Sequence, residues 1–132
     1  MPVFKDVSVV KDIFGDLWST MIKKTDFGPK MKESNISVLY IVSNPDVAMY
    51  VDGDTVKWDE EAKNMNATIT MTMSADTVHK FWLKKLNLPK ALATRQIKTK
   101  GPVPKILKLL PFLKPGYPLY KEYCKKYNLP TE

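Results

Sequence analysis

The sequence predicts an α+β fold in which a five-stranded mixed β-sheet carries helices packed on one face. Two patterns support this prediction: a strand, helix, strand order between Ala67 and Gly101, and two short apolar runs on either side of Asp52-Gly53. Strands repeat every two residues and helices every 3.6, so the spacing of apolar residues separates the two kinds of element. We expect a single domain over residues 1–132, because a chain of this length can bury about two-thirds of its unfolded surface.

The first half of the chain predicts one helix and three strands. Residues 6–25 place their apolar side chains on one side, as an amphipathic helix does. Residues 26–34 show no clear period and are predicted to form a loop. Residues 36–43 predict a strongly apolar strand, and the runs 47–51 and 55–58 predict a hairpin, because Asp-Gly suits a tight turn.

The next segment shows both periods in succession. Threonines alternate with apolar residues from 68 to 73 and predict a half-buried strand, after which Ser74 or Asp76 can cap an aromatic helix. A short helical turn follows Pro89, and residues 96–101 predict the fifth strand, closed by a glycine that tolerates positive φ. Because helices connect the fourth and fifth strands, we expect these strands to be parallel or non-adjacent, and the sheet to be mixed.

Two further helices are predicted beyond Gly101. Pro102 and Pro104 suit the start of a helix, and its leucine-rich continuation is expected to stop at Pro111. In the final segment, residues 117–127, tyrosines and the single cysteine recur at spacings of three and four. We expect this helix to lie as a lid or flank against the core.

Charge is distributed unevenly along the chain. The net charge is +7, but the segment from Lys84 to Glu132 holds twelve Lys or Arg against two acidic residues. Such asymmetry favours contact with phosphate-bearing surfaces, either anionic lipid head groups or nucleic acid. A solvated basic face without a partner is the other explanation.

The sequence offers little for catalysis or for metal binding. His79 is the only histidine, and we expect it at the surface because no nucleophile or orienting carboxylate can be assigned to it. Cys124 is the only cysteine, which excludes an intrachain disulfide and favours a small buried group. The acidic residues around the predicted hairpin lack the spacing of a calcium loop, and the five glycines are too far apart for a phosphate loop. We therefore expect no enzyme, no cofactor and no bound metal.

The segment from Ala67 to Gly101 resembles the sterol carrier protein 2 (SCP2) lipid-binding family. The resemblance lies in the runs ATITMTM, SADTVHKFW, KLNLPKA and QIKTKG, which correspond to a strand, a capped aromatic helix, a turn and a strand. Lys84 departs from the family, which often has a glycine there, and Leu88 lengthens the turn by one residue. The resemblance implies an apolar tunnel between sheet and helices. It also implies a non-catalytic carrier of a fatty acyl chain, acyl-CoA, phospholipid or sterol-like molecule.

The resemblance also suggests which residues line the tunnel. Methionines on strands are flexible and polarizable, so they can adjust to an acyl chain or a ring system, although spacing alone fits simple core packing equally well. The expected lining consists of Trp18, Met49, Met71, Met73, Phe81, Trp82, Leu92, Ile106, Leu110, Phe112 and Leu113. Lys105, Lys108 and Lys114 are expected to dock the tunnel mouth on an anionic membrane.

Two other hypotheses stay open at this stage. Tyrosines interleaved with lysines after residue 116 resemble the stacking platforms of a nucleic-acid-binding module, although no RNA- or DNA-binding signature accompanies them. The domain could instead act as an accessory partner of a lipid-modifying enzyme. The sequence has no apolar run long enough to span a membrane, no secretion signal and no peroxisomal address at its end, so we expect a cytoplasmic protein.

Overall fold

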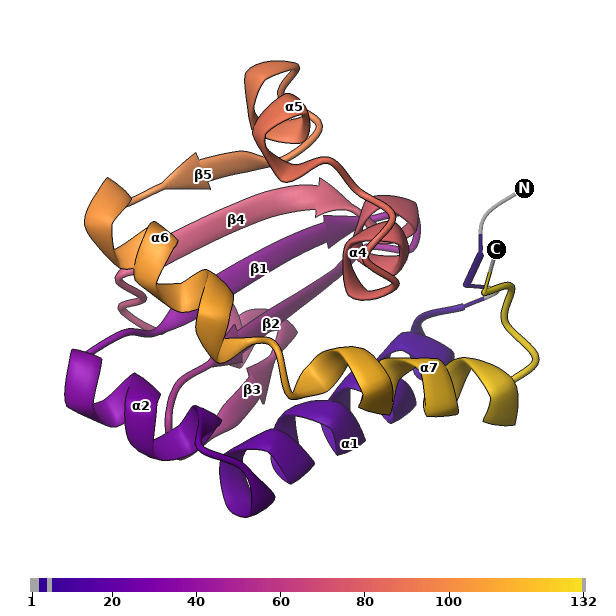
Figure 1. Cartoon of the computed structure of the whole chain (residues 1–132), viewed down its shortest axis with the longest axis horizontal. Helices are drawn as coiled ribbons and strands as arrows, with labels where there is room; N and C mark the ends of the chain where they lie inside the picture. Colours follow the sequence, from indigo (N-terminus) through magenta and orange to yellow (C-terminus); the bar gives the residue numbers. More distant parts are fainter. Residues whose placement is uncertain (1–2, 5, 132) are drawn as a thin grey trace.

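The structure, a computed structural model, describes residues 3–4 and 6–131, apart from the side chain of Leu88. Over this range the chain forms one five-stranded sheet in the order β3-β2-β1-β4-β5, with seven helices around it (Figure 1). The predicted α+β class and the number of strands are thereby confirmed.

The sheet is mixed, as predicted. Its strands are β1 (Val38–Ser43), β2 (Val47–Val51), β3 (Val56–Trp58), β4 (Ile69–Ser74) and β5 (Lys98–Lys100). The central strand β1 pairs antiparallel with β2 and parallel with β4. The reasoning about β4 and β5 was wrong, however, because these two strands are adjacent and antiparallel. The parallel pair arises earlier, where the chain passes through β2, β3 and one helix before it returns beside β1.

A layer of helices covers one face of the sheet (Figure 1). They are α1 (Val7–Lys24), α2 (Phe27–Ser34), α4 (Ala75–Trp82), α6 (Val103–Phe112) and α7 (Gly116–Lys126). The short helix α5 (Leu88–Ala93) sits beside the β5 edge. Helices pack on one face as predicted, and α3 (Asp59–Lys63) adds a short helix on the opposite face, where its buried Ala62 packs against Leu39, Ala48 and Tyr50.

Two predicted boundaries also differ. Residues 27–34 form a helix where a loop was expected, because Phe27 and Met31 are buried one turn apart and a Gly-Pro pair obscures that spacing. Helix α6 runs through Pro111 instead of stopping there. Pro111 lies in the last turn, and the carbonyl that its missing N–H would have bonded belongs to the exposed residue Leu107, so the missing N–H costs little.

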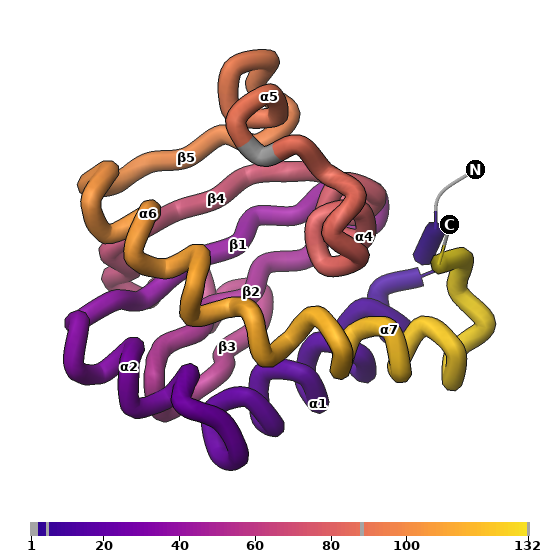
Figure 2. The backbone as a smooth tube through the Cα atoms, viewed as in Figure 1, coloured from indigo at the N-terminus to yellow at the C-terminus, as the bar shows by residue number. Residues whose placement is uncertain are grey.

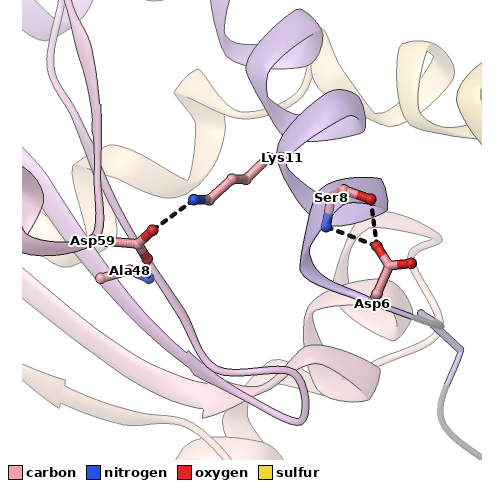
Figure 3. A network of polar contacts seen from close by, with 5 residues as sticks. All are labelled: Asp6, Ser8, Lys11, Ala48 and Asp59. Atoms are coloured by element: carbon pink, nitrogen blue, oxygen red, sulfur yellow. Dashed lines mark hydrogen bonds and ion pairs between the residues drawn. The ribbon is translucent and has the colours of Figure 1, made fainter.

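Polar contacts fix the start of α1 and tie it to the sheet (Figure 3). The Asp6 carboxylate caps the helix by accepting from the backbone N–H groups of Ser8 (2.8 Å) and Val9 (3.3 Å). One turn later the Lys11 ammonium donates to Asp59 over 2.6 Å, and Asp59 also accepts from the Ala48 N–H. The bond from Lys11 is the main reason that the pKa of Asp59 is lowered.

The main core lies between the helix layer and the sheet. Aromatic rings fill much of it: Trp18 lies 5.4 Å from Trp82 and Phe14 lies 5.6 Å from Tyr120, measured between ring centroids. Gly116 allows this packing, because a Cβ there would come within 2.5 Å of the Trp82 ring. The interior of this part of the molecule is therefore closely interlocked.

Candidate functional site

A small apolar cavity lies between the sheet and the helix layer. Its volume is about 10 Å³, and one water molecule needs about 10–15 Å³. Its walls come from β1, β2, β4, α1 and α4, from the segment before β5 and from the end of α6. The lining residues are Trp18, Tyr40, Met49, Met71, Met73, Val78, Phe81, Trp82, Ile97 and Leu113. Among the described residues this small pocket lies where the sequence suggested a tunnel, and the continuous tunnel stays a prediction.

The register of the sheet explains why these side chains meet. Tyr40 on the central strand pairs with Met49 on one side and with Met71 on the other, so the three side chains form one row across the sheet. Met73 follows two residues after Met71 and points to the same face. Two strand-borne methionines thus flank an aromatic ring on the floor of the cavity.

The structure brings seven of the eleven expected lining residues to the cavity, and their role in lipid binding stays a prediction. These seven are Trp18, Met49, Met71, Met73, Phe81, Trp82 and Leu113. The other four lie elsewhere: Leu92 is exposed on α5, Ile106 is buried beneath α6, and Leu110 and Phe112 are half-buried. The helix α5 turns Ala91 inward and so directs Leu92 to solvent.

Three lining residues were missed, and each had a signal in the sequence. Tyr40 alternates with Val38 and Val42 on the buried face of its strand, and Val78 lies on the predicted apolar side of its helix. Ile97 precedes the exposed strand β5 and is itself buried. Burial raises the pKa of the Tyr40 phenol, so this hydroxyl stays neutral beside the cavity.

His79 is buried, so its expected surface position was wrong. Only 5% of the residue is exposed. Its Nδ1 lies 2.6 Å from the Tyr120 hydroxyl and its Nε2 lies 2.7 Å from the Pro130 carbonyl oxygen. Because the carbonyl can only accept, Nε2 carries the proton and Nδ1 accepts from Tyr120. Burial lowers the pKa of His79, which keeps the ring neutral.

His79 has a fastening role that the sequence did not reveal. Through Nε2 it holds the C-terminal segment against α4, and on the same helix the Asp76 carboxylate accepts from the Val3 N–H over 2.9 Å. Both ends of the described chain therefore meet at α4 (Figure 2). The partner residues lie 51 and 73 positions away in the chain. A contact of such sequence separation leaves no periodic signal.

The three lysines that were expected to dock on a membrane lie on or next to α6. The Lys105 ammonium donates to the Asn35 carbonyl over 3.0 Å, whereas Lys108 and Lys114 are exposed. Beside them Val103 and Leu107 are 64% and 62% exposed. They are one helical turn apart and form a ridge on the outer side of α6, which we call the α6 ridge.

The remaining candidate groups have structural partners. Asp52 closes the β2–β3 turn by accepting from the N–H groups of Asp54 and Thr55, and these bonds lower its pKa although burial acts in the opposite direction. Asp54 pairs with Lys32. Cys124 is fully buried, as expected. Within the described part of the chain no three His, Cys, Asp or Glu residues gather as metal ligands would. No described helix combines the length and apolar character that a bilayer crossing requires.

Comparison with known proteins identifies the fold. No protein-family model and no curated relative matches the sequence. Solved structures do match. The sterol carrier protein domain 2 of Helicoverpa armigera aligns with a TM-score of 0.65 at 18% identity, over 86% of this chain and 91% of that one. The chain has the sterol carrier protein 2 fold.

Two further SCP2 structures support this assignment. The apo form of sterol carrier protein 2 from Yarrowia lipolytica aligns with a TM-score of 0.64 at 19% identity, over 80% of this chain and 90% of that one. Sterol carrier protein 2 like 2 from Aedes aegypti aligns with a TM-score of 0.55 at 17% identity, over 77% and 94%. In the SCP2 fold of this chain, Lys84 adopts a φ of 62°, a left-handed conformation that glycine adopts most easily.

Proposed function

We propose that this protein is a non-catalytic, cytoplasmic lipid carrier that holds a long apolar ligand between its sheet and its helices. The observation that supports the proposal is the apolar cavity inside an SCP2 fold, with methionines on three of its lining positions. A ligand would enlarge the cavity by displacing side chains. Unbranched methionine side chains can change conformation at little cost, so they suit such a site.

The energetics of such a site favour reversible binding. Burying about fifteen methylenes at roughly 0.8 kcal/mol each contributes about 12 kcal/mol. Association costs about 4 to 15 kcal/mol, and opening a nearly filled cavity adds to that cost. The net affinity is therefore moderate. A carrier needs this balance, because a ligand that is held too tightly is never delivered.

The packing of the C-terminal tyrosines argues against the nucleic-acid alternative. Tyr120 is fully buried and bonded to His79, and Tyr117, Tyr123 and Tyr127 are partly buried against the same core. Stacking platforms for bases need free ring faces. An accessory role beside a lipid-modifying enzyme is compatible with the same cavity and would use it to present the lipid.

Native mass spectrometry followed by organic extraction tests the proposal directly, and a fluorescent fatty-acid probe then tests the site. We expect a stoichiometric lipid in the purified protein, and we expect Phe81→Asp to abolish probe uptake by placing a charge in the cavity wall. Leu92→Asp is the matched control, since Leu92 is exposed and lies outside the cavity. Full uptake by a folded Phe81→Asp variant, or a salt-sensitive oligonucleotide complex without any lipid uptake, would refute the carrier proposal.

We also propose that this carrier meets its lipid source at an anionic bilayer, through the α6 ridge and its lysines. The outward side of α6 presents Val103, Pro104, Leu107 and Pro111, so its most exposed residues are largely apolar. No Asp or Glu occurs between Thr77 and Lys121, so the surroundings of the ridge in the sequence are purely basic. Apolar side chains flanked by lysines suit an interface of acyl chains and anionic head groups.

Vesicle flotation tests the docking surface. We expect binding to phosphatidylcholine vesicles that contain phosphatidylserine, and weaker binding to phosphatidylcholine alone. The double variant Val103→Ser/Leu107→Ser should lose at least about tenfold in vesicle affinity. Ile41→Ser, an exposed residue of β1 that points away from the helix layer, is the control. Equal binding to both kinds of vesicle would exclude the α6 ridge and its lysines as a surface for anionic bilayers. So would a dimer in solution that the double variant abolishes and the control does not, because the ridge would then be a dimer interface.

A further inference from the structure

One buried polar atom lacks a partner, and it belongs to a residue that lines the cavity. The indole N–H of Trp18 is inaccessible to solvent and has no hydrogen-bond acceptor among the described residues. Trp18 itself is 1% exposed and lines the cavity. It is the only buried side-chain nitrogen or oxygen in the described part of the chain that is left without a hydrogen bond. Native proteins rarely leave such donors unpaired, because the lost hydration is not replaced.

Rings surround Trp18, and the one hydroxyl that they carry, that of Tyr40, does not accept from the Trp18 N–H. Tyr40 stacks on it at 5.6 Å, Phe27 lies at 5.7 Å and Trp82 meets it edge-on at 5.4 Å, measured between ring centroids. A single water would be a poor partner, because the cavity barely has the volume for one and a buried water needs two to four polar neighbours. The acceptor is then expected to come from whatever enters the cavity.

We propose that Trp18 is the polar anchor of the site, and that its indole N–H donates to an oxygen of the bound lipid. This inference rests on the proposed carrier function. The oxygen belongs to a neutral group such as an ester carbonyl, a ketone or a hydroxyl. A carboxylate or phosphate at this depth would be an ion facing only neutral donors, the Trp18 indole and the Tyr40 hydroxyl, and no Lys, Arg or His lines the cavity to pair with it. A charged head group, where the ligand has one, therefore stays outside.

The proposal predicts a preference between two ligands that have the same chain length. Methyl palmitate carries an ester carbonyl, and hexadecane carries no oxygen. Trp18→Phe keeps a ring in place but removes the donor. We expect this variant to bind methyl palmitate about tenfold more weakly than the wild type does, with hexadecane binding changed far less. Trp58→Phe is the control, because Trp58 lies outside the cavity and is only half-buried.

A second readout uses the indole protons of the folded wild type, observed by NMR in protein labelled with nitrogen-15 in its tryptophans. Methyl palmitate should move the Trp18 indole proton downfield, hexadecane should not, and the Trp58 proton should stay in place with both ligands. A Trp18→Phe variant that loses both ligands equally, or keeps both, would overturn the anchor. The anchor would also be overturned if methyl palmitate bound without a downfield shift of the Trp18 indole proton. The N–H would then face an aromatic ring and not an oxygen of the ligand. Failure of the wild type to take up either ligand would instead refute the carrier function, and the anchor with it.

Discussion

The core between the sheet and the helix layer has two parts that pack differently. In the first part, which we call the aromatic half, the rings of Phe14, Tyr120 and His79 pack closely, and His79 also bonds to the Tyr120 hydroxyl. In the methionine half, Met49 and Met71 flank Tyr40 beside a remaining void. Rings have few conformers and fix the shape of the site, whereas methionines can move without breaking it. The difference indicates which half a ligand would displace.

Truncation of the aromatic half should have the largest effect on stability. Phe14 is fully buried and does not line the cavity. We expect Phe14→Ala to lower the free energy of unfolding by about 3–5 kcal/mol, measured by urea denaturation. We expect a fatty-acid probe not to restore this loss, because Phe14 does not line the cavity and packs against Trp18 and Trp82, whose rings form part of the cavity wall. If the probe raised the melting temperature of Phe14→Ala more than that of the wild type, the ligand would also bind in the aromatic half. The two halves would then not differ in their response to ligand.

Truncation of a side chain in the methionine half should lower the free energy of unfolding somewhat less, and a ligand should restore part of the lost stability. Met71 is buried and lines the cavity, so Met71→Ala is expected to cost about 2–4 kcal/mol by leaving a larger void. The same probe should occupy that void and raise the melting temperature more than it does in the wild type, because a ligand that binds only the folded state stabilises it. A thermal shift that equals the one in Phe14→Ala would contradict the comparison.

Local periodicity was sufficient to predict most of the fold. The Asp-Gly hairpin, the capped helix after β4 and the amphipathic α1 depend on residues close in sequence, and all three form as predicted. The order of strands depends on which distant segments pair, and a single sequence holds no direct signal for that. This is why β4 and β5 were expected to be parallel or non-adjacent, whereas they pair antiparallel and the parallel pair is β1 and β4.

The candidate site was predictable only in part, for a similar reason. Met49, Met71 and Met73 could be assigned to strands and hence to a face, and they do reach the cavity. Leu92 and Ile106 depended on how short helices rotate against the sheet, which their few residues do not determine. Whether a buried face is filled or hollow depends on the fit between elements, so the sequence could not foretell a cavity of about 10 Å³.

The smallest expected effect is a pH dependence that arises in the aromatic half. Burial lowers the pKa of His79 below its ordinary value of 6.5, so below this pH the unfolded chain binds a proton that the folded protein does not. The contribution of His79 is therefore fully present above pH 6.5 and declines as the pH falls towards the folded pKa. The slope for one proton is at most about 1.4 kcal/mol per pH unit.

Urea denaturation between pH 7.5 and 5 measures this effect, and His79→Gln should remove the decline over that range. The range also separates His79 from the paired carboxylates. The pKa of Asp59 is lowered from 3.8, so the stability it contributes is lost only at more acid pH. A wild-type stability that stays constant from pH 7.5 to 5 would mean that the histidine titrates alike in both states. His79 would then accept a proton in the folded protein as readily as it does in water. Its hydrogen bonds to Tyr120 and Pro130 would not depend on a neutral ring, contrary to the role inferred for it.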